Sequence, residues 1–140
     1  MRIITRSKYI AHTEPLFKCT KILKFGDLLK LNALVFYYKL LNNKVPQYFM
    51  DFILTPLNMT HNYNTRYGQY IPHNVTRTHS AQHCLRHSLS SLINASPINI
   101  MTISQTHSIE WLKSELKRNF IESYSVECNI RNCYVCTQIQ

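Results

Sequence analysis

Three cysteines near the end of the chain have a spacing that could hold a metal ion. Cys128, Cys133 and Cys136 stand in the stretch ECNIRNCYVC, and the last two form a C-x2-C pair. Such a pair is typical of half a zinc knuckle, but a structural zinc needs four ligands. No ligand follows Cys136, and the nearest upstream candidates are His107 and Cys84. The spacing therefore leaves three readings: a zinc site closed over a long distance, a truncated chain, or no metal.

Histidines form the second group. His79, His83 and His87 are spaced by four residues, with Cys84 beside them. On one helix they would share a face, and an i, i+4 pair can bind zinc. The stretch has no H-E-x-x-H motif, and residues 61–109 contain no Asp or Glu that could act as a base. We therefore interpret these histidines as polar groups on a basic surface rather than as a centre for metal-dependent hydrolysis.

The acidic and nucleophilic residues do not form a recognisable catalytic motif. The chain has seven Asp and Glu residues, none of which falls in a familiar metal-binding or acid–base pattern. It also lacks a glycine-rich phosphate loop. Cys84 lies next to His83 and near His87, but such adjacency arises easily by chance. We predict that the chain is not an enzyme.

Charge points to a polyanionic partner. The formal net charge is +9, from 16 Lys and Arg against 7 Asp and Glu. The excess lies in the first two-thirds of the chain, where the acid-free stretch 61–109 has three bases: Arg66, Arg77 and Arg86. A basic surface binds phosphates with release of counterions, so RNA or DNA is the predicted partner.

Tyrosines surround one of these arginines. In NYNTRYGQY, Tyr63, Tyr67 and Tyr70 alternate with polar residues and Arg66. Aromatic rings among bases can stack on unpaired nucleotides while arginine holds phosphate. A tyrosine-rich loop that packs on neighbouring helices explains the pattern equally well.

No segment indicates a membrane or a secretory route. The N-terminus lacks an apolar run long enough for a signal peptide, and LVFYYKLL is too short to span a bilayer. We expect an intracellular protein, nuclear or cytoplasmic, with no membrane partner and no small-molecule substrate.

The first half of the chain predicts a helical hairpin over residues 1–54. Thr13, Glu14 and Pro15 favour a helix start, and that helix should run to about Thr20. Gly26 should interrupt the helical structure, and Asp27 should cap the next helix. This second helix has apolar residues over most of its circumference, which predicts burial on more than one side. A short helix should restart at Pro46.

The second half predicts a polar loop, a helical segment and a tail. The loop covers residues 55–79 and should include a short β-hairpin around 69–71 and 75–77. Residues 80–122 should be helical, although a strand is the rival for their first part. Thr106 or Ser108 should cap the last amphipathic helix, and residues 123–140 form the cysteine-containing tail. The predicted class is a mainly α, single-domain chain.

The order of several segments resembles a known family. These are RIITRSKYIAHTEPLFK, LLKLNALVFYYKLLNNKVPQYF, HNYNTR, RTHSAQHCLRHSLSSLIN, THS before an amphipathic helix, and the terminal NCYVC. Together they resemble the C-terminal region of reverse transcriptases from non-LTR retrotransposons, the LINE class with its jockey-like elements.

This resemblance implies a region downstream of the polymerase palm, with RIIT at the end of a thumb-like helix. The family's catalytic F/Y-A-D-D box is absent here, so the resemblance implies a fragment that contributes nucleic-acid binding without catalysis. It places Arg2, Arg6, Lys8 and Arg66 at basic positions that grip template or target. Cys128, Cys133 and Cys136 match the cysteines that end many such proteins, although four ligands are usual. A standalone nucleic-acid-binding protein is one alternative. The other is a helical protein-interaction module with an exposed aromatic face on YYKLLNNKVPQYF.

Overall fold

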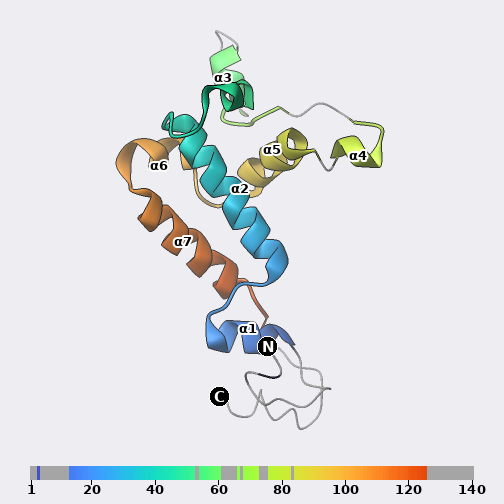
Figure 1. Cartoon of the computed structure of the whole chain (residues 1–140), viewed down its shortest axis with the longest axis vertical. Helices are drawn as coiled ribbons and strands as arrows, with labels where there is room; N and C mark the ends of the chain where they lie inside the picture. Colours follow the sequence, from blue (N-terminus) through green and yellow to red (C-terminus); the bar gives the residue numbers. More distant parts are fainter. Residues whose placement is uncertain are drawn as a thin grey trace. The chain divides into compact units, whose positions relative to one another are not determined.

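The fold is known from a computed structural model, which describes residues 3, 13–52, 54–60, 66, 68–72, 76–82 and 84–125. These residues form helices joined by turns and coil, and none of them lies in a strand. The prediction of a mainly α chain is thus confirmed (Figure 1).

The chain divides into two compact units rather than one. Unit 1 comprises residues 1–29 and 113–140, and unit 2 comprises residues 30–112. The boundaries fall within two helices, α2 and α7. The elements in chain order are α1 (Thr13–Thr20), α2 (Phe25–Leu41), the 3-10 helix η1 (Gln47–Phe52), α3 (Leu57–Thr60), α4 (His79–Gln82), α5 (Leu85–Ala95), α6 (Ile100–Thr106) and α7 (Ile109–Glu122).

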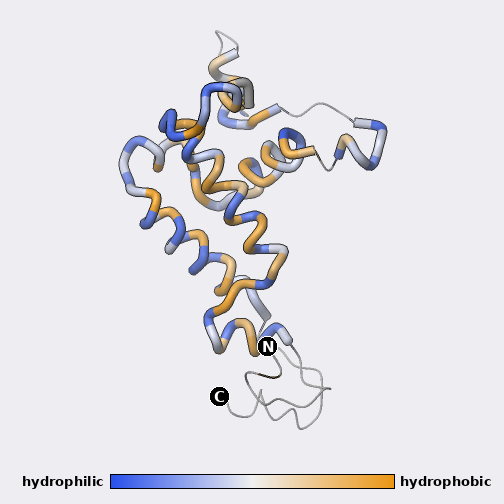
Figure 2. The backbone as a smooth tube through the Cα atoms, in the orientation of Figure 1, coloured by the Kyte–Doolittle hydropathy of each residue, from blue (hydrophilic) through white to orange (hydrophobic). Residues whose placement is uncertain are grey.

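Helix α2 supplies much of the core of unit 2. Its buried side chains face several directions, as the spread of apolar residues predicted: Leu31, Leu34, Val35, Tyr37, Tyr38 and Leu40. Apolar residues colour most of the α2 tube orange in Figure 2, whereas the tube of α7 alternates between orange and blue. The first turns of α2 differ, because Phe25, Leu28 and Leu29 are largely exposed. The buried residues of α2 therefore begin at Leu31, and the apolar residues of its first turns lie outside the core.

Two buried tyrosines tie unit 2 together through their hydroxyls. Tyr37 donates to the carbonyl oxygen of Leu54 at 2.9 Å, and Tyr38 donates to that of His107 at 2.7 Å. Burial raises the pKa of Tyr37 from 10.0 to about 12. Because these rings point inward, the aromatic face expected for a protein-interaction module is not exposed at Tyr37 and Tyr38. Tyr48 in η1 is exposed instead.

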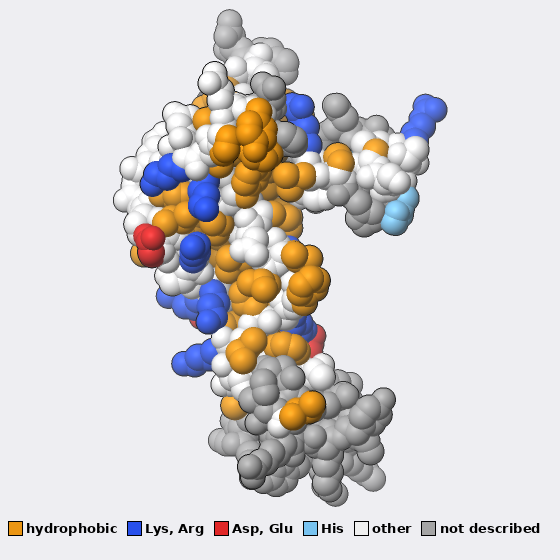
Figure 3. All heavy atoms as spheres, viewed as in Figure 1, with side chains coloured by type: hydrophobic (Ala, Val, Ile, Leu, Met, Phe, Trp, Pro, Cys, Tyr) orange, Lys and Arg blue, Asp and Glu red, His pale blue; other side chains and the backbone are white. Residues whose placement is uncertain are grey.

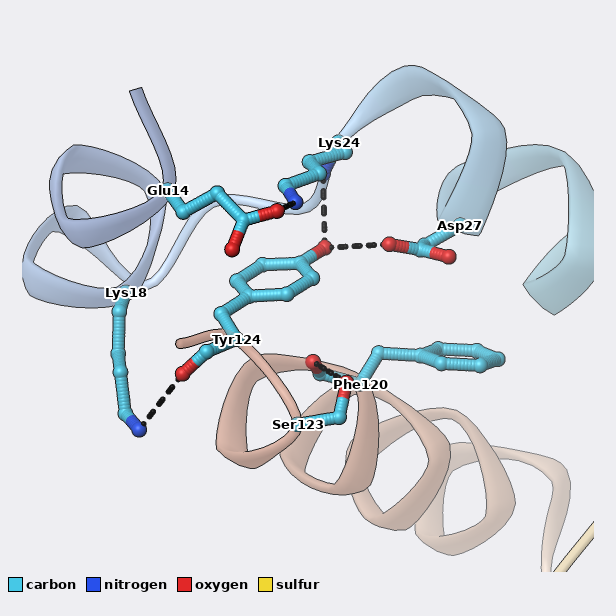
Figure 4. Close-up of polar contacts among 7 residues, drawn as sticks. All are labelled: Glu14, Lys18, Lys24, Asp27, Phe120, Ser123 and Tyr124. Carbon is cyan, nitrogen blue, oxygen red and sulfur yellow. Dashed lines mark hydrogen bonds and ion pairs between the residues drawn. The ribbon is translucent and has the colours of Figure 1, made fainter. Parts of the chain in front are cut away.

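A tyrosine also organises unit 1. The Tyr124 hydroxyl donates to the Asp27 carboxylate at 2.8 Å and accepts from the Lys24 backbone amide at 3.0 Å (Figure 4). Lys18 Nζ donates to the Tyr124 carbonyl at 2.9 Å, and Lys24 Nζ pairs with Glu14. These bonds hold Tyr124, two residues after the end of α7, against α1 and the start of α2. Burial is the main cause of a raised pKa for Tyr124.

Helix ends show both correct and missed predictions. Ser108 Oγ accepts from the backbone amide of Trp111, so Ser108 caps α7 as expected. Gly26 does not interrupt the helical structure, because α2 begins at Phe25 and includes Asp27 in its first turn. The carboxylate of Asp27 instead serves Tyr124. Helix α6 lies within the segment 80–122 that was predicted to be helical, but its start was not predicted as a separate one, although Asn99 before it accepts from two backbone amides as a standard N-cap.

The polar region also differs from expectation. The described residues of the expected β-hairpin, 69–71 and 76–77, are turn and coil. Gln69 and Ile71 bond to side chains of Asn99 and Asn94, not to a neighbouring strand. The expected loop contains α3, and the helix expected from residue 80 is split into α4 and α5, with a bend at Cys84.

No helix in the described part of the chain is both long and apolar enough to cross a membrane.

Candidate nucleic-acid interface

An open groove in unit 2 is lined in part by Arg66, one of the predicted binding residues. Its volume is about 830 Å³. Three segments line it: the region of α3, the turn around Gly68, and the stretch from the end of α5 into α6. The lining residues are Pro56, Met59, Arg66, Gly68, Gln69, Tyr70, Ile71, Ile93, Asn94, Ser96, Pro97, Ile98, Asn99, Met101 and Thr102. None of them is acidic.

Asn94, in the last turn of α5, fixes the turn segment in place. Its Oδ1 accepts from the Ile71 backbone amide and its Nδ2 donates to the Ile71 carbonyl, both at 2.9 Å. The Ile71 side chain is 1% exposed, so it anchors the same segment in the core. On the other side, the Leu57 amide donates to the carbonyl of Tyr70 at 3.0 Å. The segment that carries Tyr70 is therefore held from two directions.

Hydrogen bonds fix the orientation of two side-chain amides at the groove, those of Asn99 and Gln69. Asn99 Oδ1 accepts from the backbone amides of Met101 and Thr102, and a backbone N–H can only donate. Asn99 Nδ2 must therefore be the donor to Gln69 Oε1, at 3.1 Å. This fixes the Gln69 amide with its Nε2 as a donor, for which no acceptor is found in the described part of the chain. The lining thus includes a side-chain amide donor at Gln69 that has no described acceptor, and it includes no carboxylate.

The arginines of unit 2 lack acidic partners. Arg66, Arg77 and Arg86 are exposed, and no carboxylate among the described residues forms an ion pair with them. Unit 1 differs, because there Lys24 pairs with Glu14 and Arg118 with Glu115. On the face drawn in Figure 3, blue basic side chains are common and red acidic ones are few. Unpaired cations keep their full charge for an anion that arrives from solution.

The structure brings only part of the predicted site together. Arg66 lines the groove with Tyr70, whereas Arg77 precedes α4 and Arg86 lies in the first turn of α5. The other predicted nucleic-acid residues, and all three candidate zinc ligands, lie outside the described residues: Arg2, Arg6, Lys8, Tyr63, Tyr67, Cys128, Cys133 and Cys136.

Metal ligands do not cluster in the described region. No group of three or more His, Cys, Asp or Glu residues suited to a metal ion occurs there. His79 lies in α4 and His87 in α5, so these two residues do not share one helix; His83 is outside the described residues. Cys84, a candidate distant ligand, is exposed and forms no disulfide.

The sequence reading missed Gln69, Asn94 and Asn99. Asn99 carries a local signal, since an Asn before an apolar run is a common N-cap. Gln69 and Asn94 carry none, because their partners lie 30 and 23 residues away.

Comparisons with protein-family models, with curated proteins and with solved structures found no match for this chain.

Proposed function

We propose that this chain binds RNA or DNA through unit 2, without catalysing a reaction. The observation that carries the proposal is the set of exposed arginines, Arg66, Arg77 and Arg86, in a stretch that contains no acid from residue 61 to 109. Arginine donates to phosphate oxygens in a fork geometry, and such contacts supply most of the affinity for nucleic acid.

The groove supports the same proposal. Its lining includes Arg66 and the amide donor of Gln69 and has no carboxylate, so its chemistry suits an anionic chain that carries acceptor atoms. An enzyme that transfers nucleotides needs carboxylates for metal ions, and the groove supplies none. Binding is therefore the role that the residues favour.

The order of sequence segments, which resembles that of non-LTR reverse transcriptases, indicates the larger protein in which such binding would act. As a piece of a non-LTR reverse transcriptase, the chain would help to hold template or target while the palm performs DNA synthesis. Zinc held by Cys128, Cys133 and Cys136 would belong to a second contact with nucleic acid in the tail. Zinc quantification on the purified chain, with and without these cysteines, tests that part separately.

Salt-dependent binding is the direct test. The anisotropy of a labelled oligonucleotide gives the affinity between 50 and 200 mM salt, roughly the range over which phosphate contacts change affinity most visibly. The variant Arg66→Gln, Arg77→Gln, Arg86→Gln should bind more weakly. Its slope of log affinity against log salt should fall by about 2 on a single strand, since each lost phosphate contact contributes about 0.7.

A second triple variant separates position from net charge. Lys21, Lys113 and Lys117 are exposed residues of unit 1, and their change to Gln removes the same three charges. This control should keep most of the affinity and the slope. Equal losses in both variants, or an affinity that does not depend on salt, would refute the proposed interface.

A further inference from the structure

We propose that the groove receives one unpaired nucleotide, with its base on Tyr70 and its phosphate at Arg66, so that the chain prefers single strands. This inference rests on the proposed function and adds the class of nucleic acid and the place of contact.

The ring of Tyr70 is suited to stacking on the face of an unpaired base and not to contacting a duplex. Tyr70 lines the groove and is 38% exposed. In a duplex the base faces are covered by their neighbours, and only base edges are open in the grooves. A tyrosine ring can therefore stack on a base only when that base is unpaired, as in many single-strand readers.

The size of the groove agrees with a nucleotide. At about 830 Å³ it lies within the roughly 300–1,000 Å³ typical of ligand sites. Arg66 and Tyr70 both line this groove and are four residues apart in the sequence, which agrees with a phosphate at one and its base at the other. Apolar residues such as Ile93 and Met101 contribute to the lining and suit the flat faces of a base.

Polar donors complete the fit. The amide of Gln69, oriented by Asn99, has an Nε2 donor for which the described residues supply no acceptor. Base edges and sugar oxygens are rich in acceptors. The segment is also fixed in advance, because Asn94 and the Leu57 amide hold the residues around Tyr70. Little ordering cost then remains for binding.

The experiment compares three probes of equal length on the full chain: a single strand, a duplex, and a single strand of abasic nucleotides. Tyr70→Ala should weaken binding to the ordinary single strand by roughly 5- to 150-fold, because this is the change in affinity that the loss of one stacked base produces. It should leave duplex binding unchanged. Tyr70→Phe should bind like the wild type, and Tyr48→Ala, an exposed tyrosine outside the groove, should have little effect.

The abasic probe keeps the phosphates and removes the bases. The wild type should lose affinity for it, and Tyr70→Ala should lose little more, since both changes remove the same contact. If the alanine variant unfolds at the assay temperature, the comparison of ordinary and abasic strands on the wild type still tests the inference. Equal binding of duplex, ordinary and abasic strands by the wild type overturns the inference. If the arginine triple variant still weakens that binding, the proposed function survives; if no probe binds, the function fails as well.

Discussion

Replacing Asn94 with alanine tests whether one side chain holds the binding groove in shape. The change removes both 2.9 Å hydrogen bonds to Ile71. Each hydrogen bond contributes about 1 kcal/mol net, and a backbone group left without a partner costs a further 1–3 kcal/mol. Because the site is part-buried, water can reach one of these groups, so we expect a loss of about 2–4 kcal/mol in the free energy of unfolding.

Urea unfolding provides the measurement. Trp111 is the single tryptophan and belongs to unit 2, so its fluorescence reports on that unit. With a slope of about 2 kcal/mol per molar urea, in the middle of the usual range, the midpoint should fall by roughly 1–2 M. Asn32→Ala is the matched control: Asn32 is exposed within α2, and its replacement should change stability by less than about 0.5 kcal/mol.

Binding should fall with stability in this variant. Without urea, and at a temperature where the variant is still folded, Asn94→Ala should hold Tyr70 and Arg66 less firmly. It should therefore bind a single strand more weakly than the wild type does. A stability loss no larger than that of Asn32→Ala would show that the two hydrogen bonds do not hold the segment. A clear stability loss with unchanged binding would show that the groove is not where nucleic acid binds.

Three further changes test the two units. Leu34→Asp places a charge at a side chain that is 2% exposed and should unfold the chain; unchanged circular dichroism and melting would contradict its place in the core. Tyr37 keeps its proton in the folded state up to a pKa of about 12 but loses it near 10.0 when unfolded, so its contribution to stability is fully present below pH 10 and falls by roughly 2–3 kcal/mol as pH rises through 12. Tyr37→Phe should reduce this alkaline loss in urea titrations at each pH, leaving the part due to Tyr124, whereas Tyr48→Phe, at an exposed position, should leave it unchanged. Tyr124→Phe removes a hydrogen bond to the charged Asp27 and should cost about 1.5–3 kcal/mol; a double-mutant cycle with Asp27→Asn that shows no coupling would contradict that contact.

Local rules in the sequence were enough to predict the class of fold and several helices. The helix start at Thr13, the burial of α2 on several sides and the cap at Ser108 depend on neighbours within a few residues. Propensity, capping and periodicity act over that range, so they can be read from the chain alone. The excess of basic residues and the absence of acids from 61 to 109 are likewise properties of the sequence.

Contacts between distant residues needed the tertiary structure. Asp27 looked like a helix cap, but its carboxylate accepts from Tyr124, 97 residues away. Residues 69–71 looked like a strand, but Asn94 and Asn99 supply partners for this segment, which removes the need for a second strand. The groove arises because three separated segments meet at these amides, and no local pattern encodes that meeting. The sequence determined the charge and the helices of this protein, and long-range hydrogen bonding and burial decided which of its polar residues line the groove.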